Sequence, residues 1–408
     1  MKKNLLLSFI CFSALLVSCS KDNEENKENL QPIALETDVC QIVPIHAPLD
    51  WGSTATYEWS IESAPAENYS LTGIHKAQAL FLAASGGTYQ LKLKISNGER
   101  NESVDVTINV KEPTTSLSPY IAKVYDLLPA PGQFTNSIPE YKPGDTQSAM
   151  IEKAESYLVG KKNGGLVSLG GFGGYIVFGF DHTVVNVKGK RDIRVMGNAF
   201  YSNANPQPDA PKGGSCEPGI IMVSQDANKN GIPDDEWYEI AGSEYAKPTS
   251  IKNYEITYYR PTSEEATENG GGNVTIKNYI RWEDNQGNSG YKVKNSFHAQ
   301  SYYPSWIKED KITFKGTLLP DNAIDESGEG TYWVLYAYGY GYADNALNSE
   351  EDSAFDIDWA VNAKGEKVQL PGIDFVKVYT GVNQEAGWLG EVSTEIAGAS
   401  DLHLSGSN

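Results

Sequence analysis

Residues 86–110 read GGTYQLKLKISNGERNESVDVTINV, and this stretch decides the fold of the N-terminal part of the chain. Apolar side chains alternate with lysines at 91–95, and apolar and polar side chains alternate again at 104–110. The tripeptide Ser96-Asn97-Gly98 between the two runs has the composition of a tight turn. Alternation with a period of two is typical of a strand with one buried face, so the stretch predicts a β-hairpin.

A further alternating run, Tyr57-Glu58-Trp59-Ser60-Ile61, precedes this hairpin. A tryptophan in an early strand followed by a late hairpin is the pattern of an immunoglobulin (Ig)-like β-sandwich. Together with Gly87-Thr88-Tyr89, these segments resemble a polycystic-kidney-disease (PKD) type domain. We expect this domain at residues 32–112, and the resemblance implies a spacer or an adhesive module.

Residues 120–404 predict a larger domain that contains one short helix. Asp145 or Thr146 can cap a helix whose apolar residues recur through 150–158 and which ends at Gly160. Beyond this helix, short strands alternate with turns rich in glycine and asparagine, which is typical of a sandwich or a jelly roll. The predicted fold class is therefore all-β: an Ig/PKD-like sandwich followed by a jelly-roll-like β-sandwich, which we expect to bind the ligand.

The N-terminus has the features of a lipoprotein export signal. Two lysines precede an apolar run at 5–17, which is too short to span a membrane. The tetrapeptide Leu16-Val17-Ser18-Cys19 resembles a bacterial lipobox, which implies that residues 1–18 are a signal peptide and that Cys19 is lipidated. The alternative is an ordinary signal peptide with a chance cysteine.

Residues 19–31 predict a flexible acylated tether because they are short, polar and charged. They resemble the acidic export signals of surface lipoproteins in Gram-negative gut anaerobes, although a solvated linker has the same composition. The resemblance implies a protein anchored by lipid in the outer membrane and facing the cell exterior.

The chain is strongly acidic. Its formal charge is −20, and removal of Lys2 and Lys3 with the signal would make it −22. This charge argues against nucleic acid and anionic lipid as partners. Cys40 and Cys216 would remain after processing, and they could pair across the domain boundary in an oxidising compartment.

The loop 226–237, DANKNGIPDDEW, carries most of an EF-hand-type calcium pattern. Its expected ligands are side-chain oxygens and one main-chain carbonyl, supplied by Asp226, Asn228, Asn230, Ile232, Asp234, Asp235 and Glu236. Trp237 stands where an EF-hand has its bidentate glutamate, and strands rather than helices flank the loop. We therefore expect a structural calcium site in a β-hairpin loop, and the alternative is a solvated acidic turn.

Other reactive patterns in the chain are weak. The glycines at 170–174 lack a phosphate-binding partner motif and favour close strand packing. His182, His298 and His403 are scattered, which favours structural or surface histidines over a catalytic group. Paired carboxylates are expected in so acidic a chain, so the sequence predicts a protein that is not an enzyme.

Aromatic side chains are the strongest candidates for ligand contact. Exposed rings form binding platforms because they supply contact area at low entropic cost. Tyr338-Gly339-Tyr340-Gly341-Tyr342 would place three rings on one side if it were extended. The expected ligand-binding residues are Tyr302, Tyr303, Trp306, Tyr338, Tyr340 and Tyr342, and an aromatic core is the alternative.

Several segments are distinctive as a set: GGFGGYIV at 170–177, Asp181-His182, EPGIIMVSQD at 217–226, WYEIAGS at 237–243 and DFVKVYTGV at 374–382. With the lipobox and the PKD-like domain, they resemble the cell-surface lipoproteins of cobalamin (vitamin B12) uptake systems in gut anaerobes. The resemblance implies capture of cobalamin or other corrinoids and delivery to a TonB-dependent outer-membrane transporter. Three other hypotheses remain open: a calcium-stabilised glycan-binding lipoprotein, a hydrolase that uses a carboxylate pair, and a structural adhesin.

Overall fold

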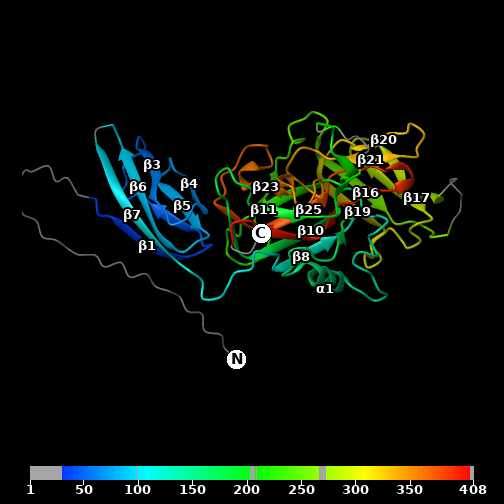
Figure 1. The fold of residues 1–408 in the computed structure, drawn as a ribbon, viewed down its shortest axis with the longest axis horizontal. Coiled ribbons are helices and arrows are strands. Elements are labelled where there is room, and N and C mark those ends of the chain that lie inside the picture. Colours follow the sequence, from blue (N-terminus) through cyan, green and yellow to red (C-terminus); the bar gives the residue numbers. More distant parts are fainter. Residues whose placement is uncertain (1–29, 99, 203–206, 208, 266–272, 405–408) are drawn as a thin grey trace, which may run out of the picture.

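The computed structural model describes residues 30–98, 100–202, 207, 209–265 and 273–404. The expected signal peptide, Cys19 and tether residues up to 29 lie outside this range. Figure 1 shows a small β domain beside a larger one, joined by a single extended segment. Among the helices of the described residues, none has the length and hydropathy that a membrane crossing requires.

The N-terminal domain is a sandwich of two sheets. One sheet has the order β1(Ile33–Asp38), β7(Asn101–Lys111), β6(Gly87–Ser96), β3(Thr56–Ser63), and the other has the order β2(Val43–His46), β5(Gln78–Ala83), β4(Tyr69–Thr72). The predicted hairpin is confirmed, since β6 pairs with β7 from Gly87↔Val110 to Ser96↔Asn101. The alternating apolar residues of both strands are buried, as is Trp59, and they pack against Phe81 of the facing sheet. The domain is therefore Ig/PKD-like, as predicted.

The second domain is built around a seven-stranded sheet. Its main path is β24(Ala360–Val361), β15(Trp237–Ile240), β14(Gly219–Ser224), β25(Gly372–Thr380), β10(Tyr175–Val185), β8(Lys123–Leu128), and β22(Tyr342–Ala343) also pairs with β14. Both faces are buried. Ile221 and Val223 of β14 belong to one core cluster, whereas Ile220 and Met222 belong to another. Side chains that alternate along one strand thus enter two cores.

Each face of this sheet has its own cover. The face that carries Ile221 and Val223 is covered by α1(Gln147–Leu158) and by a sheet of β23(Ala354–Phe355), β11(Ile193–Met196) and β27(Gly398–Asp401). The second packs against a four-stranded sheet, β18(Ser289–Asn295), β17(Val274–Asp284), β16(Ile251–Tyr259), β19(Lys311–Leu318). Two smaller sheets complete the domain: β12(Phe200–Tyr201), β13(Gly213–Ser215), β21(Trp333–Tyr336), β20(Ala323–Asp325), and β26(Glu395–Ile396) with β9(Val167–Ser168). The predicted all-β class with one short α-helix is confirmed for the described residues.

The helix α1 forms where its sequence signals predicted. The Thr146 hydroxyl caps it by accepting from the Ala149 amide at 3.3 Å. Met150, Ala154 and Leu158 recur at helical spacing and are buried. Gly160 follows the helix with φ of +69°, a conformation that glycine adopts without steric cost.

The glycine-rich segment 170–174 allows close packing, as expected. At Gly173, a Cβ atom would lie 2.2 Å from the Cβ of Phe314, and φ is +86°. At Gly174, a Cβ atom would lie 1.8 Å from the carbonyl oxygen of Leu169. A side chain at position 173 would push β19 of the covering sheet away, and a side chain at position 174 would displace the backbone at Leu169.

The two domains share a packed junction. Val185, the last residue of β10, and Val187, two residues further on, belong to the hydrophobic core of the N-terminal domain. Asn68 of that domain donates to the carbonyl oxygen of His403 at 3.2 Å. Cys40 and Cys216 do not pair across the boundary: both are free and buried.

Candidate ligand-binding site

Tyr302, Tyr303 and Trp306 do not form the exposed platform that the sequence suggested, because all three are buried. The ring of Tyr302 packs edge-on against Tyr279 at 5.3 Å. The Trp306 indole donates to Gln147 at 2.8 Å. Trp306 thus holds the segment after β18 against the start of α1, and Tyr302 packs on β17, so the prediction of an aromatic surface here is wrong.

The Tyr338–Tyr342 run is not extended either. Gly341 has φ of +86°, which turns the chain and breaks the expected alternation. Tyr338 and Tyr342 pack edge-on within the protein with 5.6 Å between ring centroids, and Tyr342 is only 2% exposed. Tyr340 is exposed and lies 4.7 Å from Trp359. The expected three-ring platform is therefore wrong, and the alternative of an aromatic core holds for Tyr342.

A different aromatic pocket lies at the end of the second domain away from the N-terminal domain, where β17, β20 and β21 lie in Figure 1. We call it the distal pocket. Its volume is about 430 Å³, and three aromatic rings and several amide and charged groups line it. The lining residues are Trp282, Tyr291, Lys292, Asp321, Ala323, Trp333, Asn383, Gln384 and Glu385.

Two glycines position the tryptophans of the distal pocket. Trp282 of β17 pairs with Gly290 of β18, where a Cβ atom would lie 2.8 Å from the indole ring. Gly387, with φ of +54°, lies over Trp333, and a Cβ atom there would come within 2.2 Å of the indole nitrogen. The Trp333 Nε1 atom is buried and, among the described residues, lacks a hydrogen-bond acceptor. Buried donors of this kind are usually satisfied by protein, water or ligand.

The polar groups of the distal pocket are held in fixed orientations. Lys292 is 3% exposed and donates to the Asn383 side-chain oxygen at 3.1 Å. The Gln384 side chain accepts from the Asn322 amide at 2.9 Å. Burial raises the pKa of Glu385, and its carboxylate accepts from the Val293 amide at 3.1 Å. The distal pocket thus offers amide and charged groups whose orientations are fixed before any ligand binds.

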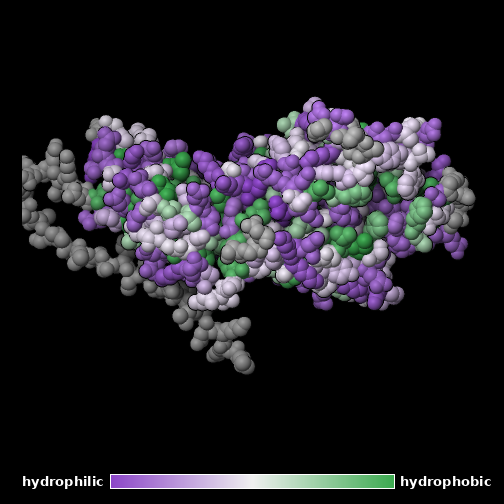
Figure 2. All heavy atoms as spheres, in the orientation of Figure 1, coloured by the Kyte–Doolittle hydropathy of each residue, from purple (hydrophilic) through white to green (hydrophobic). Residues whose placement is uncertain are grey.

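Exposed hydrophobic side chains surround this pocket. Of the eleven large hydrophobic residues exposed in the described chain, seven lie on the strands and loops at this end: Phe200, Tyr291, Phe297, Ile324, Tyr332, Trp388 and Leu389. The rings of Phe297 and Trp388 are in contact, 6.4 Å apart and edge-on. Figure 2 shows hydrophobic atoms, drawn green, interrupting the hydrophilic surface of the second domain. Such a gathering on a soluble surface is typical of a binding site.

The sequence carries little signal for the distal pocket. Trp282, Trp333 and Trp388 come from segments about 50 residues apart in the chain, and no local spacing joins them. Trp333 packs against the core of this domain and also lines the pocket. Gly290 and Gly387 are the only local hints, since glycine beside a tryptophan permits close approach.

In the loop predicted to bind calcium, several oxygen-bearing side chains make hydrogen bonds within the loop. The Asp226 carboxylate accepts from the amides of Asn230 at 3.0 Å and Gly231 at 2.8 Å. The amide groups of Asn228 and Asn230 donate to Asp234, which lowers the pKa of that carboxyl.

The remaining predicted calcium ligands have protein partners. The carboxylate of Asp235 accepts from the Ala227 amide at 3.0 Å, and the Ile232 carbonyl accepts from the Asp234 amide at 2.8 Å. The carboxylate of Glu236 accepts from the Tyr238 hydroxyl at 3.0 Å. The same loop borders a cleft of about 660 Å³ between the domains, where it faces Ile42 and Leu80.

A second acidic group lies in the interior. One oxygen each of Glu217, Asp344 and Glu395 lies within 4.8 Å of the others. Burial raises the pKa of Asp344 well above its usual range, and the neighbouring Glu395 carboxylate adds to the shift. Main-chain amides of Asn198 and Ala199 donate to Asp344 at 2.8 Å each. This cluster is separate from the predicted calcium loop.

The histidines singled out in the sequence are structural, as expected. His182 is buried between Asp181 at 2.7 Å and Asp401 at 2.9 Å. His403 pairs with the buried Asp192 at 2.7 Å. His298 packs edge-on against Phe134 at 4.6 Å.

Comparison with known proteins gives only a distant likeness. No family model and no curated protein matches the chain. A solution structure of the PKD domain from the KIAA 1837 protein matches at 16% identity and a TM-score of 0.20, over 24% of this chain and 97% of that one. The PKD domain of human KIAA0319 matches at 18% identity and a TM-score of 0.17, over 24% of this chain and all of the other. At these scores the matches carry no argument about function, and the Ig/PKD-like description rests on the two facing sheets.

Proposed function

We propose that this chain is an outer-membrane surface lipoprotein that binds cobalamin or a related corrinoid in the distal pocket and aids its delivery to a TonB-dependent transporter. The observation that carries the proposal is the juxtaposition of Trp282, Tyr291 and Trp333 with oriented amide groups. The lipobox at Cys19 and the sequence resemblance support the surface location. Binding and handover require no catalytic step.

The chemistry of a corrinoid matches this pocket. The macrocycle has an apolar face and a rim of amide groups, so it needs aromatic contact area together with neutral hydrogen-bond partners. A cavity of about 430 Å³ holds one edge of such a ligand. The exposed rings of Phe297 and Trp388 would then cover part of the face that remains outside.

Titration calorimetry of the mature chain with cyanocobalamin tests this proposal. Trp388 is 47% exposed, so Trp388→Ala should leave the fold intact and weaken binding by about tenfold, since one buried aromatic contact is worth about 1–3 kcal/mol. Tyr340→Ala is the matched control, because Tyr340 is similarly exposed at 40% but lies elsewhere. Absence of heat with the wild-type chain would end the corrinoid proposal.

A glycan is the second candidate ligand. The specific observation in its favour is the same set of rings beside Asp321, Asn383 and Gln384, because sugars stack on aromatic faces and bond to such polar groups. Titration with neutral oligosaccharides under the same conditions separates the two. The calcium-stabilised glycan-binding alternative would be favoured by two results together. A glycan would give binding heat that is lost in Trp388→Ala, and cyanocobalamin would give none.

We also propose that the 226–237 loop binds calcium as a structural ion. Its donor set fits, since Asp226, Asn228 and Asn230 bring hard oxygen atoms into one short loop. Addition of calcium at millimolar concentration should raise the melting temperature of the wild-type chain. Asp226→Asn should remove most of that rise, and Asp50→Asn, in an exposed turn of the N-terminal domain, is the control. An equal rise in melting temperature in both variants would show that calcium binds at another place in the protein.

A further inference from the structure

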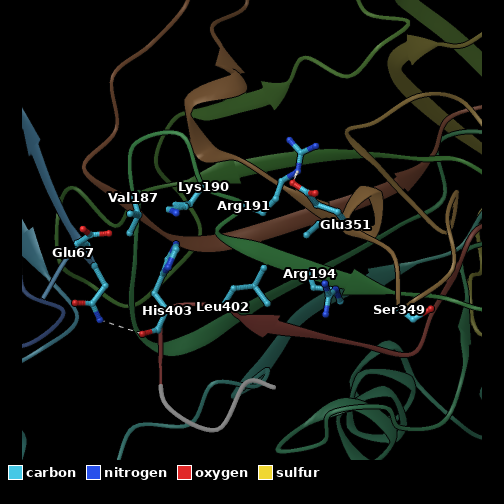
Figure 3. Close-up of a pocket in the computed structure, with 11 residues that line it drawn as sticks. Glu67, Val187, Lys190, Arg191, Arg194, Ser349, Glu351, Leu402 and His403 are labelled. Carbon is cyan, nitrogen blue, oxygen red and sulfur yellow. Dashed lines mark hydrogen bonds and ion pairs between the residues drawn. The ribbon is translucent and has the colours of Figure 1, made fainter.

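A cavity of about 560 Å³ lies where the two domains meet, and cationic side chains gather on it (Figure 3). Lys190 and Arg191 come from the turn after β10, and Arg194 lies on β11. Asn68 reaches it from the N-terminal domain, and His403 from the segment after β27. Three cations on one cavity are a marked concentration in a chain with a formal charge of −20.

Arg194 is one of the three cations that line this cavity. It lies on the middle strand of its sheet, where its neighbours across the strands are Ala354 and Ser400. Both neighbours are small and neutral, so they leave space beside the guanidinium and do not neutralise it. Its Nε atom is buried and has no hydrogen-bond acceptor among the described residues. A buried guanidinium edge without an acceptor is costly unless a ligand or water completes it.

The other two cations are also available to a ligand. Arg191 lies 4.1 Å over the Trp359 ring, and its closest carboxylates are those of Glu351 at 3.7 Å and Asp352 at 3.5 Å. Ion pairs of this length with exposed partners are weak. Lys190 is exposed, and its ammonium group has no hydrogen bond or ion pair within the part of the chain that the structure describes.

An unsatisfied acceptor completes the pattern. The Asn68 amide group donates to Ser85 at 2.9 Å and to the His403 carbonyl at 3.2 Å. Its Oδ1 atom is buried and receives no hydrogen bond from the described residues. Asn68 lines the cavity, so this acceptor belongs to a residue that lies beside the charged donors.

Two carboxylates line the same cavity and reduce its net positive charge. Glu351 is engaged with Arg191, and Glu67 comes from the N-terminal domain at the side away from Arg194 (Figure 3). The imidazole of His403 is already paired with Asp192. Among the described residues, Lys190 and Arg194 are therefore the cations of this cavity that have no ion-pair partner.

We propose that this cavity binds a sugar-sized molecule that carries a phosphate or sulfate ester. Guanidinium groups fit tetrahedral oxyanions because their N–H donors form a planar fork, and lysine adds a point charge. The cavity is larger than one oxyanion, and Asn68, whose Oδ1 atom receives no hydrogen bond from the described residues, would accept one from a hydroxyl group of the attached sugar. Because Asn68 and Arg194 belong to different domains, a bound ester also fastens the two domains together.

Calorimetric titration of the mature chain tests the site, with glucose 6-phosphate, glucose 6-sulfate and glucose as probes. We expect heat with one or both esters, weaker binding as ionic strength rises, and no heat with glucose. Lys190→Gln removes an exposed charge that has no hydrogen bond or ion pair among the described residues, and Arg194→Gln removes the charge whose Nε atom is buried. Each should weaken ester binding by about tenfold, the usual effect of losing one charge-assisted hydrogen bond. Arg281→Gln on β17, far from the cavity, is the matched control.

The outcomes separate this site from the distal pocket. Both Lys190→Gln and Arg194→Gln should leave cyanocobalamin binding unchanged. Heat with glucose 6-phosphate alone would identify phosphate esters as the ligand class, and heat with glucose 6-sulfate alone would identify sulfate esters. No heat with either ester, or equal affinity in wild type and Lys190→Gln, would overturn the proposal.

Discussion

At the scale of single residues, Glu391 is a buried carboxyl group whose pKa is raised by its surroundings. Its side chain is 5% exposed, and one carboxylate oxygen accepts from the Gln133 amide at 3.0 Å. The other oxygen is buried and has no partner among the described residues. Burial raises the pKa of Glu391 to about 8, so the folded chain retains a proton that the unfolded chain has lost.

This shift predicts a fall in stability on the alkaline side. A carboxyl whose pKa is raised by folding stabilises the fold at low pH, and this contribution is lost as pH rises from about 4.5 towards 8. Glu391→Gln should remove the pH-dependent contribution of this carboxyl group. The free energy of unfolding of the variant should therefore fall less than that of wild type between pH 5 and pH 8. Urea unfolding at the two pH values measures the difference. Equal losses in both proteins would contradict the assignment.

At the scale of elements, local patterns specify the parts of this fold and long-range packing specifies the site. The helix α1 and the β6–β7 hairpin were predicted from periodicity, a Thr cap and an Asn-Gly turn, all of which lie within a few residues. The prediction that Tyr338–Tyr342 is extended was wrong because one glycine with positive φ turns the chain. The distal pocket depends on Trp282, Trp333 and the 383–389 loop meeting across sheets, which no local spacing encodes.

The cap of α1 gives a test at this scale. Thr146→Ala removes the acceptor of the Ala149 amide and should lower the free energy of unfolding by about 1 kcal/mol. Thr146→Ser keeps a hydroxyl and should cost only a few tenths of that value. Denaturant titration distinguishes the two, and similar costs for both would mean that the cap is not formed.

At the scale of the whole molecule, we expect the two domains to unfold together, because the core of the first includes residues of the second. Val187 is 6% exposed within the N-terminal core, whereas its neighbour Lys188 is exposed. We expect wild type to unfold in a single calorimetric transition. Val187→Asp buries a charge at the junction and should split the transition in two, whereas Lys188→Asp should not. A wild-type thermogram with two separate peaks would show that the domains are independent.

The central claim is that the distal pocket captures a corrinoid, and hydrogen–deuterium exchange with and without cyanocobalamin tests it most directly. The proposal predicts slower exchange of main-chain amides in β18, in β20 and β21, and in the loop around Gly387–Leu389. Protection confined to the Tyr338–Tyr342 run or to the cleft between the domains, or no protection at all, would contradict it.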